Sequence, residues 1–184
     1  MTLNLVDLVL LILLLGAFLL GYFQGAIRQL LGLLVWLFAF LIGANLREPL
    51  GEWFSRYWTN LPTGYSRMIA FGAVFLTLLI VGNIVIQVFY KRTPITRRWT
   101  VIDEVIGGLL GAGLYVLVLA TIVIVLDSFY RVGGLGGNDV RWIRDLYVLL
   151  SGSFFVQTLK TALIPALLAI FGLLLPQEVR DVAG

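Results

Sequence analysis

The sequence predicts an all-α integral membrane protein with four to five transmembrane helices and a C-terminal amphipathic helix at the membrane interface. Of its 184 residues, 60% are hydrophobic and only 12% are charged. Ordinary soluble domains are about 45–50% apolar. Uncharged stretches of about 20 residues recur along the chain, and a helix of that length crosses a hydrocarbon core of roughly 30 Å. Lipid supplies no partner for backbone hydrogen bonds, so helices are the expected spanning form.

Four stretches have the length and apolarity of membrane spans. They are the residues between Asp7 and Arg28, Gln29–Leu46, Met68–Tyr90 and Val105–Leu126. The first helix is expected to begin at Leu3–Asp7 and to end at Gly21–Gly25. Arg28 follows at once, without a cluster of turn residues, so a hairpin unwound at the glycines is preferred to one long kinked helix or a re-entrant element.

The polar segments between these stretches predict the orientation of the chain. Arg47–Arg67 mixes charges with aromatic residues, which is typical of a connector at the level of the lipid headgroups. Lys91–Glu104 is a short loop with four basic residues close together. Because dense basic loops resist translocation, this loop is expected in the cytoplasm and the N-terminus outside.

We divide the chain into a four-span membrane bundle, residues 1–127, and a C-terminal region, residues 128–184, that starts with a Gly-rich linker. Within this region Asp139–Lys160 is predicted to form an amphipathic helix along the bilayer. Its apolar residues recur at steps of three and four: Val140, Ile143, Tyr147, Leu150 and Phe154. Thr161–Gln177 is apolar but short, and a fifth crossing, a re-entrant arm and a second interfacial helix are all open for it.

Composition excludes several function classes. The chain contains no histidine and no cysteine, which excludes His or Cys catalysis, His or Cys metal sites, haem ligation and disulfides. No serine has a base at a catalytic spacing, and adjacent helical residues such as Asp103 and Glu104 point about 100° apart. We therefore expect no enzyme and no cofactor. The net charge of +3 is spread over the loops, so membrane lipids rather than nucleic acid are the expected partners.

Three pairs of small residues at a spacing of four predict close helix packing. The pairs are Gly21 with Gly25, Gly107 with Gly111, and Gly108 with Ala112. Such pairs let two backbones approach, and van der Waals contact of this kind holds helices together in lipid. Gly107–Gly113 is the expected place of the tightest contact, and packing of the bundle is favoured over a gating role.

Four charged residues near the ends of the spans are candidates for an intramembrane polar cluster: Arg28, Asp103, Glu104 and Asp7. The predicted topology brings Arg28 to the depth of Asp103 and Glu104. Asp7 lies about 31 Å from Arg28 along a straight helix, so Arg67, Asp127 and Arg131 are its candidate partners. Pairing matters because a lone charge deep in a spanning helix costs about 2.5–3.5 kcal/mol. A role as simple membrane-boundary markers is equally open.

A family resemblance rests on the order of these residues. Asp7 opens the first helix, Gly21-Tyr22-Phe23-Gln24-Gly25-Ala26-Ile27-Arg28 closes it, Trp36 lies in the second span, and Asp103 precedes Gly107 and Gly111. This pattern, over about Leu3–Val125, resembles the colicin V production protein (CvpA) family of bacterial inner-membrane proteins. The family usually has Arg where Glu104 stands, and an Arg-Gly step at 114–115.

The resemblance implies a place in the bacterial inner (cytoplasmic) membrane and a role in toxin export or envelope homeostasis. We expect a non-enzymatic component that acts as a homo-oligomer or a subunit of a membrane complex, with the glycine faces making the contacts. A small channel or carrier with a polar cavity around Arg28 and Asp103 is the alternative. A third hypothesis is a lipid sensor that uses the amphipathic Asp139–Lys160 segment.

Overall fold

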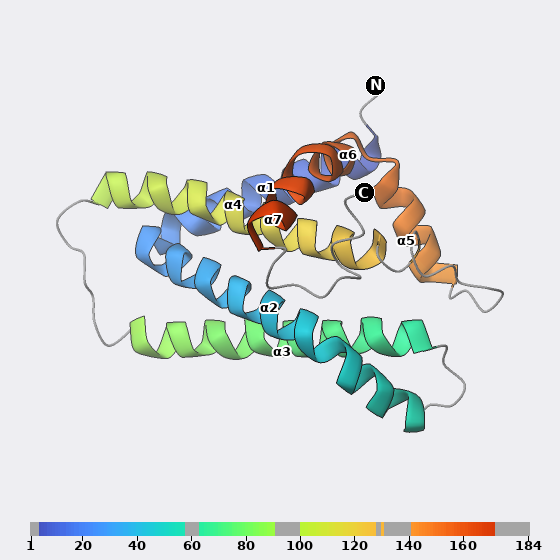
Figure 1. Cartoon of the computed structure of the whole chain (residues 1–184). Coiled ribbons are helices and arrows are strands. Elements are labelled where there is room, and N and C mark those ends of the chain that lie inside the picture. The colour runs from blue at the N-terminus through green and yellow to red at the C-terminus, as the bar shows by residue number, and fades with distance from the viewer. Residues whose placement is uncertain (1–3, 58–62, 91–99, 128–129, 131–140, 172–184) are drawn as a thin grey trace.

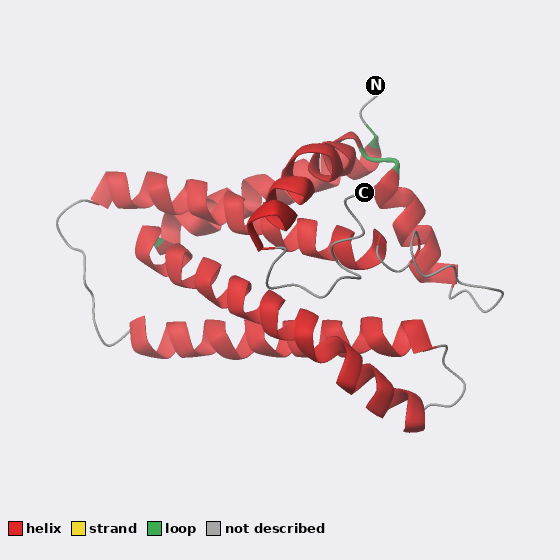
Figure 2. Ribbon diagram, viewed as in Figure 1, coloured by secondary structure: helices red, strands yellow, loops and turns green. Residues whose placement is uncertain are grey.

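The computed structural model describes residues 4–57, 63–90, 100–127, 130 and 141–171. Within these ranges the chain is helical and contains no strand, as Figures 1 and 2 show. The elements are α1 (Leu5–Gln24), α2 (Ala26–Tyr57), α3 (Thr63–Tyr90), α4 (Thr100–Asp127), α5 (Arg141–Ser151), α6 (Phe154–Thr158), the π-helical turn η2 (Leu159–Leu163) and α7 (Ile164–Phe171). The first four are long and apolar enough to cross a membrane, and the bent C-terminal pair raises the number to five. The predicted fold class is confirmed.

The four long helices alternate in direction along the chain (Figure 1). Helix α1 packs against α4, and α2 packs against both α4 and α3. Helix α3 therefore forms an outer layer that contacts the rest of the bundle mainly through α2, and Tyr65 near its start packs against Leu126 of α4. This arrangement leaves one long side of α3 without a neighbouring element among the described residues.

The chain reverses between α1 and α2 over one residue, Gly25, so the hairpin is the geometry that the structure shows. Helix α2 then continues for 32 residues, to Tyr57 and through Pro49. At about 1.5 Å per residue it is roughly 48 Å long, which exceeds the hydrocarbon core. The first half of the expected connector Arg47–Arg67 is thus a continuation of the second span.

Aromatic side chains fill the core between α2 and α3. The rings of Trp36 and Phe40 stack at 5.6 Å, and those of Phe71 and Phe75 stack at 5.5 Å. Phe40 meets Phe71 edge to face across the two helices at 6.2 Å. Helix α4 closes the same core with Leu119, Ala120, Val123 and Ile124. Three C-terminal residues complete it: Val156, Leu159 and Ile164.

The predicted amphipathic helix Asp139–Lys160 is wrong as a single element. It breaks at Gly152 and Ser153, where the helix axes bend by 78°. Ser153 starts a new helix because its hydroxyl accepts a hydrogen bond from the Val156 amide at 3.2 Å. In α5, Tyr147 and Leu150 pack against the bundle as the periodicity predicts. Phe154 begins α6 and is 43% exposed, whereas Val140 and the Ile143 side chain lie outside the described residues.

The second helix of the bent pair runs from α6 through η2 into α7. The apolar segment Thr161–Gln177 is thus no separate helix, since its described part continues the one that starts at Phe154. Pro165 is the second residue of α7, directly after the π-helical turn. Proline lacks an amide hydrogen and clashes with the carbonyl four residues earlier, which a locally wider turn accommodates. The bend makes this pair a broken span or a re-entrant loop.

Candidate functional site

The elbow between α1 and α2 depends on Gly25. Its φ of 80° and ψ of 164° belong to a backbone region that side chains exclude. A Cβ at this position would also collide with the Asp103 carboxylate from α4. Asp103 Oδ1 accepts a hydrogen bond at 3.1 Å from the amide of Ala26, the first residue of α2. Asp103 thus caps the N-terminus of a helix that lies 77 residues earlier in the chain.

The glycines predicted to pack do so against one another, across α1 and α4. A Cβ on Gly107 would lie 2.6 Å from Gly21 O and 2.8 Å from Gly25 Cα. A Cβ on Gly111 would lie 2.9 Å from Gly21 Cα. Real Cβ atoms essentially never come so close to backbone, so glycine is required at these positions. Gly21, Gly107 and Gly111 are therefore buried in a contact within one chain.

The neighbouring small residues of α4 have different surroundings. A Cβ on Gly108 would lie 2.8 Å from the ring of Phe18, so this glycine faces a side chain of α1. Ala112 is half-buried. Gly113 has no atom within 4 Å of its would-be Cβ and faces away from the contact. The tightest approach is made by Gly107 and Gly111.

The polar cluster proposed around Arg28 is only partly assembled. Asp103 is engaged by the Ala26 amide, and among the described residues no ion pair joins it to Arg28. Glu104 lies beside the Tyr22 side chain. The elbow thus gathers Asp103 and Glu104 next to the end of α1, but it does not form the expected Arg28 to Asp103 pair.

Asp7 lies at the opposite end of the bundle, buried, with 5% of its surface exposed. Its carboxylate accepts hydrogen bonds from the Ser153 hydroxyl at 2.5 Å and from the Phe155 and Phe154 amides at 2.9 and 3.3 Å. The Asn4 amide adds a bond of 2.9 Å and closes a capping box at the start of α1. Asp7 therefore holds the first turn of α6, as Asp103 holds that of α2.

Two of the predicted partners of Asp7 are wrong. Neither Arg67 nor Asp127 bonds to it, and Arg131 lies outside the described residues. Its true partner, Ser153, is 146 residues away in the sequence. The signal available in the sequence was Gly152-Ser153, a helix-breaking glycine followed by a good N-cap residue, within an otherwise helical pattern.

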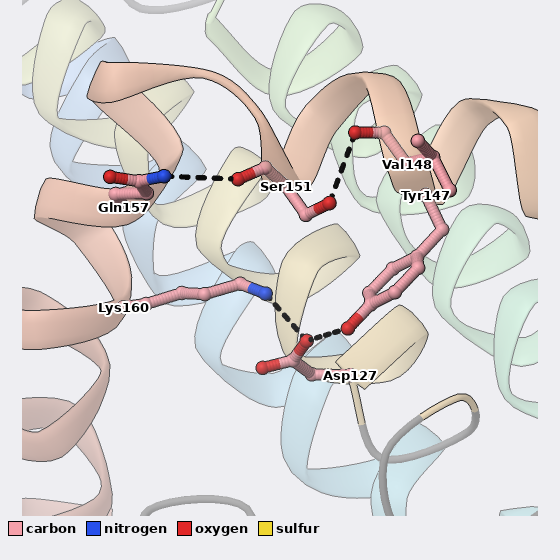
Figure 3. Close-up of polar contacts among 6 residues, drawn as sticks. All are labelled: Asp127, Tyr147, Val148, Ser151, Gln157 and Lys160. Carbon is pink, nitrogen blue, oxygen red and sulfur yellow. Dashed lines mark hydrogen bonds and ion pairs between the residues drawn. The ribbon is translucent and has the colours of Figure 1, made fainter. Parts of the chain in front are cut away.

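Asp127 is the last residue of α4, and it makes a second contact with the C-terminal helices, in addition to that of Asp7 (Figure 3). Its Oδ1 lies 2.6 Å from Lys160 Nζ and accepts a hydrogen bond of 2.9 Å from the Tyr147 hydroxyl. Lys160 also sits over the Tyr147 ring, 5.2 Å from its centroid. Figure 3 also shows the chain turning at the bend, where Gln157 Nε2 donates to the Ser151 carbonyl at 3.4 Å. Sequence reasoning missed the ion pair between Asp127 and Lys160, because the two residues were assigned to different regions, 1–127 and 128–184.

Besides the Asp103 contact at the elbow, a buried hydrogen bond joins α2 and α4 in the core. Trp36 Nε1 donates to Thr121 Oγ1 at 3.1 Å, and the Thr121 hydroxyl donates to the Leu117 carbonyl at 2.9 Å. Both donors are satisfied, as polar groups buried in an apolar bundle require. This arrangement supports packing, since it leaves neither group available to a ligand.

Taken together, three acidic side chains each hold another element: Asp103 holds α2, Asp7 holds α6, and Asp127 holds η2 and α5. Carboxylates held in this way fix the relative positions of helices. Among the described residues no group of three or more His, Cys, Asp or Glu side chains is placed to hold a metal ion.

Comparison with known proteins connects this architecture to a family. The colicin V production protein family matches residues 6–160, which include Asp7, the elbow, α4, α5 and Lys160. The colicin V production protein of Escherichia coli strain K12 is 32% identical over 109 residues, which are 58% of this chain and 63% of that protein. The chain thus aligns with less than two thirds of that relative. No solved structure matches. The predicted resemblance is confirmed, and the chain belongs to the colicin V production protein family.

Proposed function

We propose that the protein is a non-enzymatic component of the bacterial inner membrane that supports toxin production, by promoting export of the peptide or by maintaining the envelope. It acts as a homo-oligomer or as a subunit of a membrane complex. The observation that carries the proposal is the family match over residues 6–160, which covers the bundle and both acid-held contacts of the C-terminal helices. The name of the Escherichia coli relative supports a role in colicin V production.

The geometry of the acidic residues supports a scaffold rather than a reactive site. Asp7 and Asp103 each accept backbone amides at the start of a helix, and Asp127 is paired with Lys160. An acid that must leave such a contact to react would give up about 0.5–2 kcal/mol of capping stabilisation. These acids are better suited to holding helices than to moving protons or ions.

The alternative, a channel or carrier with a polar cavity around Arg28 and Asp103, receives less support from the contacts. Asp103 faces the Ala26 amide, and its Oδ2 lies against Gly25. The alternative nevertheless predicts a measurable flux. Proteoliposomes that release a trapped ion faster than protein-free vesicles, with the excess removed by Asp103→Asn, would favour it over the scaffold.

Complementation tests the proposal. The chain is expressed in an Escherichia coli strain that carries the colicin V genes but lacks its own colicin V production protein. We expect colicin V in the medium to rise, because the two proteins share a family and 32% identity. Gly113→Leu, a change on the open side of α4, is the control variant and should complement as well as the unchanged chain.

The same strain separates export from envelope maintenance. Toxin that accumulates inside cells lacking the protein indicates export, whereas detergent sensitivity without any toxin gene indicates envelope maintenance. If the chain reaches the inner membrane in the amount of the native relative and restores neither property, the proposal is wrong.

A further inference from the structure

The outer face of α3 carries a regular row of exposed residues, here called the α3 seam. The α3 seam consists of Ile69, Ala73, Leu76, Ile80, Asn83 and Gln87. Its steps alternate between four and three, which is the heptad spacing of left-handed helix pairs. All six side chains are exposed, with Leu76 at 57% and Ile80 at 60%. From first to last residue the row is about 27 Å long, close to the thickness of the hydrocarbon core.

The α3 seam lies away from the contact between α3 and α2. Phe71, Phe75 and Ile86 are buried, and a Cβ on Gly82 would collide with Val35 of α2. These residues mark the inner side of α3, and helical geometry places the seam about 130° around the helix from them, more than a third of a turn. Figure 1 shows α3 on the side of α2 that faces away from α1 and α4, with the C-terminal end of α2 crossing past it.

Asn83 is a polar residue on this face, and its side-chain amide is only partly hydrogen-bonded. It lies about 10 Å from the middle of α3, inside the hydrocarbon region of a centred span. One hydrogen of its amide donates to the Leu79 carbonyl at 2.8 Å. Among the described residues nothing donates to its oxygen or accepts its second hydrogen, and Gln87 has no hydrogen bond at all. Unsatisfied amides are costly in lipid, so they favour contact with another polar group.

The glycine faces do not supply the contact between copies that the sequence suggested. Gly21, Gly107 and Gly111 pack against backbone within one chain, so no second chain can reach them without separating α1 from α4. The α3 seam, in contrast, is accessible over its whole length. An association surface for this protein therefore has to be sought on the outer layer of the bundle.

We propose that the α3 seam is a homodimer interface, in which α3 of a second copy packs in parallel against it. Copies in one membrane share one orientation, so a two-fold axis along the membrane normal brings each seam residue to its own counterpart. An amide carries both a donor and an acceptor, so Asn83 satisfies Asn83 of the second copy. A buried Asn in a heptad core is known to specify a dimer and its register. This inference rests on the oligomer named in the proposed function.

Cysteine crosslinking tests the position of the interface. The chain has no cysteine, so single cysteines can be placed in the full-length protein without other changes. In native membranes, Leu76→Cys and Ile80→Cys are expected to form disulfide-linked dimers on oxidation, because paired Cα atoms must come within about 7 Å. Val81→Cys and Val85→Cys are the matched controls, being 51% and 47% exposed on the same helix but off the seam. They should stay monomeric.

A second measurement tests the amide. In vesicles of phosphatidylethanolamine and phosphatidylglycerol, Asn83→Leu is expected to weaken dimerisation about 3- to 18-fold, which corresponds to a hydrogen bond between helices of about 0.6–1.7 kcal/mol. Asn83→Gln keeps a side-chain amide and should retain most of the dimerisation affinity of the unchanged protein. Asn45→Leu is the control, since Asn45 of α2 makes the same side-chain bond to its own helix, at 2.8 Å to the Leu41 carbonyl. It should leave dimerisation unchanged.

Three results would overturn the proposal. Equal crosslinking on and off the seam would place the contact elsewhere. Crosslinks at the seam to a different polypeptide would identify a heterologous partner, and a monomer at every protein-to-lipid ratio would exclude self-association. Each of these results is independent of the colicin V assay, so a chain that complements as a monomer refutes the dimer and leaves the proposed function standing.

Discussion

The contact between α1 and α4 is made by backbone, whereas the contact between α2 and α3 is made mostly by side chains. In the first, Gly21 and Gly107 leave no room for a Cβ, and the atoms in its way are carbonyl groups and Cα atoms. In the second, a Cβ on Gly43 would meet the ring of Phe71 at 3.2 Å. Rings can shift by a few tenths of an ångström more easily than helix axes can. The two contacts should therefore respond very differently to added volume.

The largest expected effect comes from Gly107→Leu, which breaks the backbone contact. Its Cβ alone would lie 2.6 Å from Gly21 O, so α1 and α4 must separate. Overpacking of this kind costs about 3 kcal/mol or more when backbone has to move. Gly113→Leu, on the open side of the same helix, should cost far less. Thermal unfolding of both variants in one detergent checks the difference, and equal melting temperatures would contradict the backbone contact.

The second-largest effect is expected at the elbow, where Asp103 of α4 caps the start of α2. Asp103→Ala removes the acceptor for the Ala26 amide without adding volume, and loss of such a cap costs about 0.5–2 kcal/mol. Asp103→Asn keeps an acceptor oxygen and should retain most of the stability. The equilibrium of unfolding, measured in bicelles, distinguishes them. If Asp103→Asn were as unstable as Asp103→Ala, the charge rather than the hydrogen bond would be decisive.

A smaller effect is expected at the buried hydrogen bond between Trp36 of α2 and Thr121 of α4. Trp36→Phe keeps an aromatic ring beside Phe40 but removes the donor to Thr121, at a cost of about 1 kcal/mol. A double-mutant cycle with Thr121→Val isolates the bond, because the second substitution should add little once the first is present. Full additivity of the two losses would show that the bond contributes nothing.

The smallest effect is expected from Gly43→Ala, which can be compared directly with the same substitution at Gly107. Gly43→Ala adds one methyl group against the Phe71 ring, which is edge-on to Phe40 and can tilt. We expect the free energy of unfolding to change by less than about 1 kcal/mol. Gly107→Ala, with the same added atom, should be clearly more destabilising. A loss at Gly43 as large as that at Gly107 would mean that the two contacts are equally rigid.

The sequence was most informative about features that depend on local composition. The apolar runs predicted four spans, all of which are helices, because the demands of lipid act on each segment separately. The glycine spacing also pointed to the region where α1 meets α4. Both signals lie within one or two turns of a helix, so a single sequence carries them.

Contacts between distant segments could not be derived in this way. Nothing near Asp7 indicates that Ser153 is its partner, and nothing near Asp127 indicates Lys160. Charge matching suggested basic partners for Asp7, yet backbone amides and a hydroxyl satisfy it. The helix break at Gly152 was also missed, since the apolar periodicity continues across it and hides the change of direction. Such partners depend on topology, which local patterns do not encode.

The one-residue elbow at Gly25 has a consequence for the order of assembly. Ala26 and Asp103 are separated by 77 residues, which a ribosome adding about 5–20 residues per second synthesises in roughly 4–15 s. Helix α2 is itself made in the first part of that interval, and once Tyr57 has been added the first hairpin is complete while the carboxylate that secures its corner has not been made. The elbow is thus closed by a later helix, and the early hairpin has to wait, uncapped, for α4 to arrive.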